Sequence, residues 1–134
     1  MIIKPRVRGF ICITAHPDGC EAHVQEQANY VLSQGALPHA PKRVLILGAS
    51  TGYGLASRIV STVGSQADTF GVFFERPADD GKPASPGWYN TWALEKIADK
   101  AGVKFYSMNG DAFSAEFKAK VIKALRETLG TVDC

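Results

Sequence analysis

The sequence predicts an α/β fold in which a Rossmann-like parallel sheet carries helices on both faces. Three short apolar segments alternate with three segments whose apolar residues recur at helical spacing, an order typical of strand–helix–strand units. In addition, the segment 43–55 runs from an apolar stretch through three glycines into a helical pattern. We therefore expect residues 43–134 to form the first half of a Rossmann domain, and residues 1–42 to form an N-terminal strand–helix extension and linker.

The N-terminal extension is predicted to contain one strand and one helix. Residues 10–14 are apolar and rich in β-branched side chains, which predicts a buried strand. Apolar residues recur on one side of the segment 20–32, which predicts an amphipathic helix that ends at Gly35. Residues 36–42 contain two prolines and are expected to link this helix to the sheet.

The other predicted elements alternate from residue 43 onward. We expect strands at 44–47, 69–74 and 103–108, helices at 55–63, 91–101 and 115–129, and a long, exposed, mobile loop at 76–89. The apolar run 44–47 is of the kind buried on both faces of a parallel sheet. Asn90 and Ser114 are predicted to cap the last two helices. Residues 131–134 are predicted to begin a further strand, which in a Rossmann sheet lies beside the first.

The glycine turn between the first predicted strand and its helix is the strongest functional signal. Gly48, Gly52 and Gly54 give the spacing G-x-x-x-G-x-G, which resembles the turn of the short-chain dehydrogenase/reductase superfamily. Unpaired N–H groups at a helix N-terminus suit a phosphate, and glycines let the backbone approach it. We expect a seat for a dinucleotide pyrophosphate; the alternative is a tight turn that binds nothing. The polar residues within the turn are Ser50, Thr51 and Tyr53. They can contribute hydroxyl or N–H groups to the seat, or serve as capping and turn residues.

Acidic residues follow the second and third predicted strands. Glu75 lies about 20 residues after Gly54, the spacing at which a carboxylate accepts from the adenosine ribose hydroxyls and repels a 2′-phosphate. This favours NADH over NADPH, although a guanidinium at the neighbouring Arg76 could instead receive that phosphate. At the third strand, Asp111 can accept from the adenine amino group while the small Ala112 leaves room for the ring. The alternative for Asp111 is a turn residue that bonds its own backbone.

Eight segments spread along the chain carry a resemblance to a known family. They are Met-Ile-Ile-Lys-Pro (1–5), Arg-Gly-Phe-Ile-Cys (8–12), His-Pro (16–17), Gly-Cys-Glu-Ala (19–22), Gly-Ala-Ser-Thr-Gly-Tyr-Gly-Leu (48–55), Gly-Val-Phe-Phe-Glu (71–75), Gly-Trp-Tyr-Asn (87–90) and Asn-Gly-Asp-Ala-Phe (109–113). Together they resemble the N-terminal portion of the trans-2-enoyl-CoA reductase family, the FabV-type enoyl-acyl-carrier-protein reductases of bacteria. The resemblance covers the whole chain.

The resemblance implies NADH-dependent reduction of the 2,3 double bond of trans-2-enoyl thioesters, of coenzyme A or acyl carrier protein, in fatty-acid biosynthesis. It also implies a full-length monomer and a set of residues that contact NADH. These are Gly48, Ala49, Ser50, Thr51, Gly52, Tyr53, Phe74, Glu75, Asp111 and Ala112.

The catalytic pair of the family has no counterpart in these 134 residues. The resemblance implies a Tyr-x8-Lys pair well beyond position 134, and no tyrosine here has a lysine nine positions on. Tyr89 and Lys96 have the Tyr-x6-Lys spacing of other enoyl reductases, but they follow the second strand rather than a later one. We therefore expect no catalytic residue in this chain and no reductase activity from these residues alone.

The composition argues against several other classes of protein. With 15 basic and 13 acidic residues the formal charge is +2, which gives no reason to expect a nucleic-acid partner. No apolar stretch reaches membrane-spanning length, and three cysteines do not form a disulfide framework. We expect a soluble cytoplasmic protein. Two alternative functions stay open: a non-catalytic NAD(H)-binding redox sensor, and a different reductase of the short-chain dehydrogenase superfamily.

A metal site is the remaining alternative. Cys12, His16, Cys20 and His23 fall within 12 residues and are all zinc-type ligands. They lack the two closely spaced pairs of a zinc finger, and Cys12 lies in an apolar segment. We therefore expect no bound metal.

Overall fold

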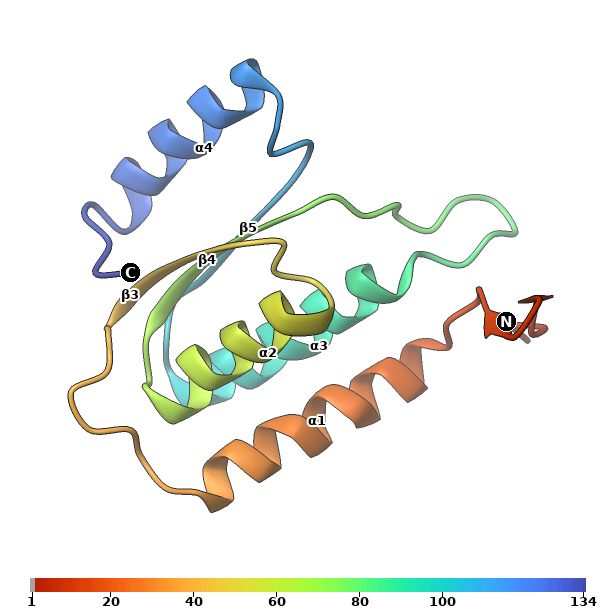
Figure 1. Cartoon of the computed structure of the whole chain (residues 1–134), viewed down its shortest axis with the longest axis horizontal. Coiled ribbons are helices and arrows are strands. Elements are labelled where there is room, and N and C mark those ends of the chain that lie inside the picture. The colour runs from red at the N-terminus through yellow and green to blue at the C-terminus, as the bar shows by residue number, and fades with distance from the viewer. Residues whose placement is uncertain (1) are drawn as a thin grey trace.

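The computed structural model describes residues 2–134, so Met1 of the first family-like segment lies outside the described residues. Figure 1 shows a central sheet with helices on both sides and a small N-terminal hairpin. The elements in chain order are β1 (Val7–Arg8), β2 (Ile11–Cys12), α1 (Pro17–Ser33), β3 (Arg43–Leu47), α2 (Gly52–Ile59), the π-helical turn η1 (Val60–Gly64), β4 (Asp68–Phe73), α3 (Pro86–Ala101), β5 (Phe105–Asn109) and α4 (Ala115–Thr128).

The main sheet is parallel and has the order β3-β4-β5, which confirms the predicted fold class. Val44 pairs with Thr69, and Thr69 pairs with Phe105. The last residues of the chain run along the other edge of β3, where the Asp133 N–H donates to the Arg43 carbonyl (2.8 Å) and the Leu45 N–H donates to the Cys134 carbonyl (2.9 Å). These residues lie where a further strand was predicted, although they form no assigned strand.

The two faces of the sheet are covered by different helices. On one face, α4 packs Val121 and Leu129 against Phe70 and Val72 of β4. On the other face, α2 and α3 lie against the sheet, and α1 packs on these two helices (Figure 1). Val121 is buried, Phe117 and Leu125 are partly buried, and Leu129 is buried just after the helix, so the four-residue steps predicted for this segment all face the sheet.

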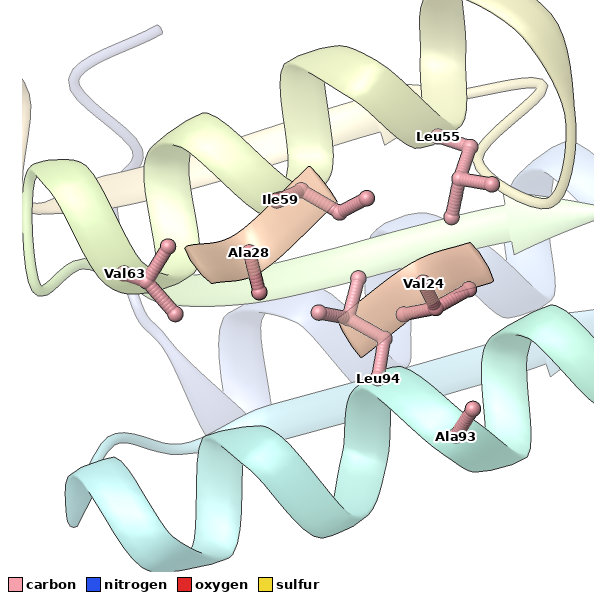
Figure 2. Packing of buried hydrophobic residues seen from close by; sticks show 7 residues of the cluster. All are labelled: Val24, Ala28, Leu55, Ile59, Val63, Ala93 and Leu94. Carbon is pink, nitrogen blue, oxygen red and sulfur yellow. The ribbon is translucent and has the colours of Figure 1, made fainter. Parts of the chain in front are cut away.

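The α1 helix closes an apolar cluster of seven buried residues. Figure 2 shows the side chains of Val24 and Ala28 of α1 facing Ile59 of α2 and Leu94 of α3. All four side chains are almost fully buried. Burying an aliphatic side chain of this size contributes about 1.5–3 kcal/mol, so α1 is an integral layer of the core.

A buried arginine joins α2 to the sheet. Arg58 is fully buried, and its guanidinium donates to the Tyr106 carbonyl (2.6 Å), the Ser107 hydroxyl (3.1 Å) and the Thr69 hydroxyl (3.3 Å). It also stacks on the Phe105 ring, with Cζ 3.5 Å from the ring centroid. Burial lowers the pKa of this guanidinium, because these partners are neutral. One side chain thus connects α2 with β4 and β5.

The predicted buried strand at 10–14 is wrong. Gly9 adopts a positive φ of 62° and reverses the chain, so β1 and β2 form a two-residue antiparallel hairpin. Phe10 is 97% exposed, and Ile11 and Ile13 are also exposed. A tight turn therefore divides the apolar run and keeps it off the main sheet.

Three predictions for the segments around β3 and α3 need correction. Leu47 is exposed, so β3 is not buried on both faces along its whole length. The loop ends at Ser85 rather than residue 89, because Pro86 starts α3, a position where its missing N–H has no cost. Ser85 is the N-cap residue, and Asn90 lies buried inside the helix. By contrast, Ser114 caps α4 as predicted, accepting from the Phe117 N–H (3.3 Å).

Candidate functional site

The glycine turn leads from the carboxyl end of β3 to the start of α2. Both the Gly48 and Ala49 N–H groups donate to the Val72 carbonyl (2.8 and 2.9 Å), which fixes the turn against β4. Gly48 and Gly52 have positive φ values of 81° and 52°, and nothing lies within 4 Å of the position of a Cβ at either residue. The backbone of the turn therefore faces open space.

Gly54 is required for a different reason. A Cβ at this position would lie 1.9 Å from the Gly48 carbonyl oxygen, a contact between backbone atoms that no side-chain motion can relieve. The first turn of α2 therefore packs directly on the preceding strand end. Thr51 is the N-cap residue, but its side chain makes no capping hydrogen bond, which leaves the first N–H groups of α2 without a side-chain acceptor. The turn and these N–H groups suit a pyrophosphate.

Glu75 is held at the end of β4 by its side chain and by its backbone. The Ser50 hydroxyl donates to Glu75 Oε1 (2.6 Å). The Glu75 N–H donates to Asn109 Oδ1 (2.8 Å), and Asn109 Nδ2 donates back to the Glu75 carbonyl (2.8 Å). The turn itself is fixed to α3, because Asn90 Nδ2 donates to the Ser50 carbonyl (3.1 Å). Residues from β5, α3 and the glycine turn therefore determine where the carboxylate lies.

The carboxylate of Glu75 also contacts the first turn of α3. A Cβ at Gly87, the second residue of that helix, would lie 2.1 Å from Glu75 Oε1 and 2.7 Å from Ser50 Cβ. Only glycine leaves space for this contact. The partial positive charge at the N-terminus of α3 favours a carboxylate here.

A hollow of about 530 Å³ lies at the carboxyl ends of the three parallel strands. Its walls include Gly48 from the turn, Phe74 after β4, and Asp111 and Ala112 after β5. Its volume is within the range of ligand sites, and the carboxyl edge of a parallel sheet is where such sites form. Phe74 is 77% exposed and forms an apolar rim.

The predicted site residues fall into two groups in the structure. Gly48, Phe74, Asp111 and Ala112 line the hollow, although Asp111 Oδ1 also accepts from the Phe113 N–H (2.9 Å), as expected of a turn residue. The remaining predicted residues, outside that lining, are Ala49, Ser50, Thr51, Gly52, Tyr53 and Glu75. Ala49 and Ser50 are buried, whereas Thr51, Gly52 and Tyr53 are exposed on the turn.

Three residues that contribute to the geometry were absent from the sequence-based prediction of the site. They are Gly87, Asn90 and Asn109. Asn109 had a signal, because an asparagine at the end of a strand beside a predicted site residue can bond a neighbouring backbone. Gly87 and Asn90 act from α3 through contacts distant in sequence, which no local pattern reveals.

The two side chains of the Tyr-x6-Lys spacing have partners elsewhere. The Tyr89 hydroxyl accepts from the Ala84 N–H (2.9 Å). Lys96 forms an ion pair with Glu21 of α1, and its ammonium lies 3.9 Å from the centroid of the Trp92 ring. Tyr89 thus holds the loop before α3, and Lys96 holds the contact between α1 and α3.

The four zinc-type ligands do not converge. Across residues 2–134, no group of three or more His, Cys, Asp or Glu side chains is placed to share a metal ion. His16 Nδ1 accepts a hydrogen bond from the Asp18 N–H (3.2 Å), and the Cys12 thiol donates a hydrogen bond to the Thr14 carbonyl (3.5 Å). Among the residues that the structure describes, no helix is both long enough and apolar enough to cross a membrane.

Comparison with known proteins identifies two family models. One, described as the NAD(P)H binding domain of trans-2-enoyl-CoA reductase, matches residues 2–80. The other, the trans-2-enoyl-CoA reductase catalytic region, matches residues 82–134. Among curated relatives, an enoyl-[acyl-carrier-protein] reductase [NADH] of Yersinia enterocolitica is 59% identical over 133 residues, which cover 99% of this chain and 33% of the relative. One from Yersinia pestis has the same identity and coverage.

The similar solved structures are also trans-2-enoyl-CoA reductases. The trans-2-enoyl-CoA reductase of Treponema denticola, in complex with NAD, is 45% identical with a TM-score of 0.86, over 95% of this chain and 33% of that one. The Clostridium acetobutulicum enzyme, in complex with NADH, is 38% identical with a TM-score of 0.91, over 99% of this chain and 33% of that one. The chain thus spans about a third of the length of the curated relatives it matches.

Proposed function

Since this chain belongs to the trans-2-enoyl-CoA reductase family, we propose that its glycine turn and the adjoining hollow bind NADH. The observation that carries the proposal is that the turn, the end of β4 and the end of β5 meet at one edge of the sheet around a hollow of about 530 Å³. The relatives named as NADH-dependent reductases, and the neighbours solved with NAD or NADH, support the same cofactor.

Each predicted site residue has a proposed role. The open backbone of the turn, from Gly48 to Tyr53, and the first N–H groups of α2 hold the pyrophosphate. Glu75 accepts from the adenosine ribose and excludes a 2′-phosphate. Phe74, Asp111 and Ala112 surround the adenine, where the free oxygen of Asp111 can accept from the amino group.

The reaction proposed for a full-length protein carrying this chain is the reduction of the 2,3 double bond of trans-2-enoyl thioesters. When bound, NADH would supply the hydride, the net reaction would also consume one proton, and enoyl-CoA or enoyl-acyl-carrier-protein is the proposed substrate. The family and the names of the relatives support these assignments, and we propose a role in fatty-acid biosynthesis. The residues of this chain contribute binding and orientation of the cofactor; we assign no catalytic residue and no metal among them.

Further features of the proposal concern organisation. Residues 1–42 form the extension and linker, and residues 43–134 form the N-terminal half of the NAD-binding Rossmann domain. A cytoplasmic location and a monomeric full-length protein complete the proposal; the former is supported by the bacterial relatives and the three free cysteines.

Direct titration tests the cofactor assignment. Purified protein is titrated with NADH and with NADPH, and binding is followed by calorimetry. We expect saturable binding of NADH and weaker binding of NADPH. Glu75→Ala should reduce that preference by about tenfold or more, the value of a hydrogen bond to a charged group. Glu127→Ala removes an exposed carboxylate from α4 and is the matched control. A protein that shows no saturable heat with NADH would overturn the assignment.

A further inference from the structure

We infer that the side chains of Ser50 and Asn109 are positioning groups for the choice of dinucleotide, because they fix the Glu75 carboxylate and backbone rather than contact the cofactor. The inference rests on the proposed NADH site. The turn hydroxyl that the sequence offers to the pyrophosphate is instead donated to Glu75 Oε1 at 2.6 Å.

The environment of Ser50 supports this role. The residue is only 4% exposed, so its hydroxyl does not face the open side of the turn where a pyrophosphate would lie. Among the described residues the Glu75 carboxylate is the one hydrogen-bond partner of this hydroxyl, which donates to it. The bond uses one lone pair of Oε1, and Oε2 accepts no hydrogen bond from the described residues, so Oε2 can accept from a ribose. Ser50 therefore orients the carboxylate and fixes where this oxygen lies.

Asn109 fixes the other half of the arrangement. Its side-chain amide makes two hydrogen bonds of 2.8 Å to the backbone of Glu75, one as acceptor and one as donor. This pair extends the contact between the two strands to Glu75, two residues beyond Phe73, whose strand partner is Asn109. Glu75 lies at the start of the loop to α3, where Asn109 fixes its own N–H and carbonyl groups and Ser85 fixes those of the next residue, Arg76.

The inference makes a specific thermodynamic prediction. A residue that acts through Glu75 changes the ratio of NADH to NADPH affinity only when Glu75 is present. A residue that binds the pyrophosphate changes both affinities by the same factor, because the two cofactors share that group. A double-mutant cycle separates these cases.

The experiment compares Ser50→Ala, Glu75→Ala and the double variant by calorimetric titration with NADH and with NADPH. We expect Ser50→Ala to lower the affinity ratio by about fivefold to tenfold, less than the loss of a whole hydrogen bond to a charged group, because the Glu75 carboxylate is still present. In the Glu75→Ala background the same substitution should leave the ratio unchanged. Ser57→Ala removes an exposed hydroxyl from α2 and is the control.

Asn109→Ala provides a second line of evidence that does not depend on a hydroxyl. We expect it to lower the ratio as well, and again only when Glu75 is present. Thermal unfolding of each variant confirms that it is folded before titration, and the Asn109 cycle decides the matter for the pair if a Ser50 variant does not fold. An equal loss of both affinities, or an unchanged ratio with Glu75 in place, would overturn the inference while leaving the NADH site intact. Failure of the unsubstituted protein to bind NADH would instead overturn the proposed function, and this inference with it.

Discussion

Replacing Gly87 by alanine tests whether the first turn of α3 forms part of the site. The new Cβ would lie 2.1 Å from Glu75 Oε1, 2.5 Å from Glu75 Cδ and 2.7 Å from Ser50 Cβ. Relaxed contacts lie at roughly 3.5–4 Å, so the carboxylate must withdraw by more than about 1 Å. The 2.6 Å hydrogen bond between Ser50 and Glu75 cannot survive that displacement.

The expected cost follows from two opposing terms. Losing a hydrogen bond to a charged group costs about 1.5–3 kcal/mol, and alanine in place of glycine in a helix returns about 0.5–1 kcal/mol. Glu75 is half-buried, so its displaced carboxylate can reach water, which favours the lower end of the first range. We expect the free energy of unfolding to fall by about 1 kcal/mol.

Urea unfolding and cofactor titration measure the two consequences of this change. The urea midpoint should fall, and the ratio of NADH to NADPH affinity should decrease, because Glu75 no longer lies at its fixed place. Gly19→Ala is the matched control: it is also near the start of a helix, its nearest contact would be an ordinary 3.9 Å, and we expect it to be stabilising by about 0.5–1 kcal/mol. If Gly87→Ala were as stable as the parent and kept its cofactor preference, the argument from packing would be refuted.

Three further predictions concern the turn, the buried arginine and the end of the chain. Gly54→Ala places a Cβ 1.9 Å from a backbone oxygen, so the affinity for NADH measured by calorimetry should fall by more than about tenfold. An unchanged affinity would contradict the packing of α2 on the turn. Arg58→Met should lower the free energy of unfolding, measured in urea, by about 1–3 kcal/mol, because the Tyr106 carbonyl loses its donor. Arg58→Lys should not restore the lost stability, since an ammonium lacks the planar fork of a guanidinium. Full stability of either variant would refute the role given to this arginine. Hydrogen bonds from the Lys42 and Arg43 N–H groups lower the pKa of Asp133, so this contact is present above the ordinary carboxyl pKa and is lost as the pH falls through the lower folded value. NMR shifts of the Lys42 and Arg43 amides should follow that titration and should not do so in Asp133→Asn.

Local sequence patterns were sufficient for the parallel sheet and its flanking helices. The apolar positions of α4 have a period that only a helix packed on one side explains, and Phe117, Val121, Leu125 and Leu129 all join the cluster under that helix. The glycines of the turn likewise follow from backbone requirements, because Gly48 and Gly52 adopt positive φ and Gly54 has no space for a Cβ.

The parts that sequence reasoning missed depend on contacts between distant segments. The apolar residues 10–14 have the composition of a strand, but Gly9 turns the chain and no sheet surface covers them. Asparagine is a residue type common at helix N-caps, yet Pro86 starts the helix earlier, and Asn90 instead bonds Ser50, 40 positions away. The choice of partner in such cases depends on tertiary packing, which propensity does not encode.

The position of α1 has a consequence for any attempt to isolate a minimal nucleotide-binding unit. This helix lies outside the sheet and its two neighbouring helices, yet it covers Ile59, Val63 and Leu94. A protein trimmed to begin at Arg43 would leave this apolar seam facing water, and two such molecules would associate through it. The shortest unit expected to stay dispersed must therefore keep the part of α1 that carries Val24 and Ala28.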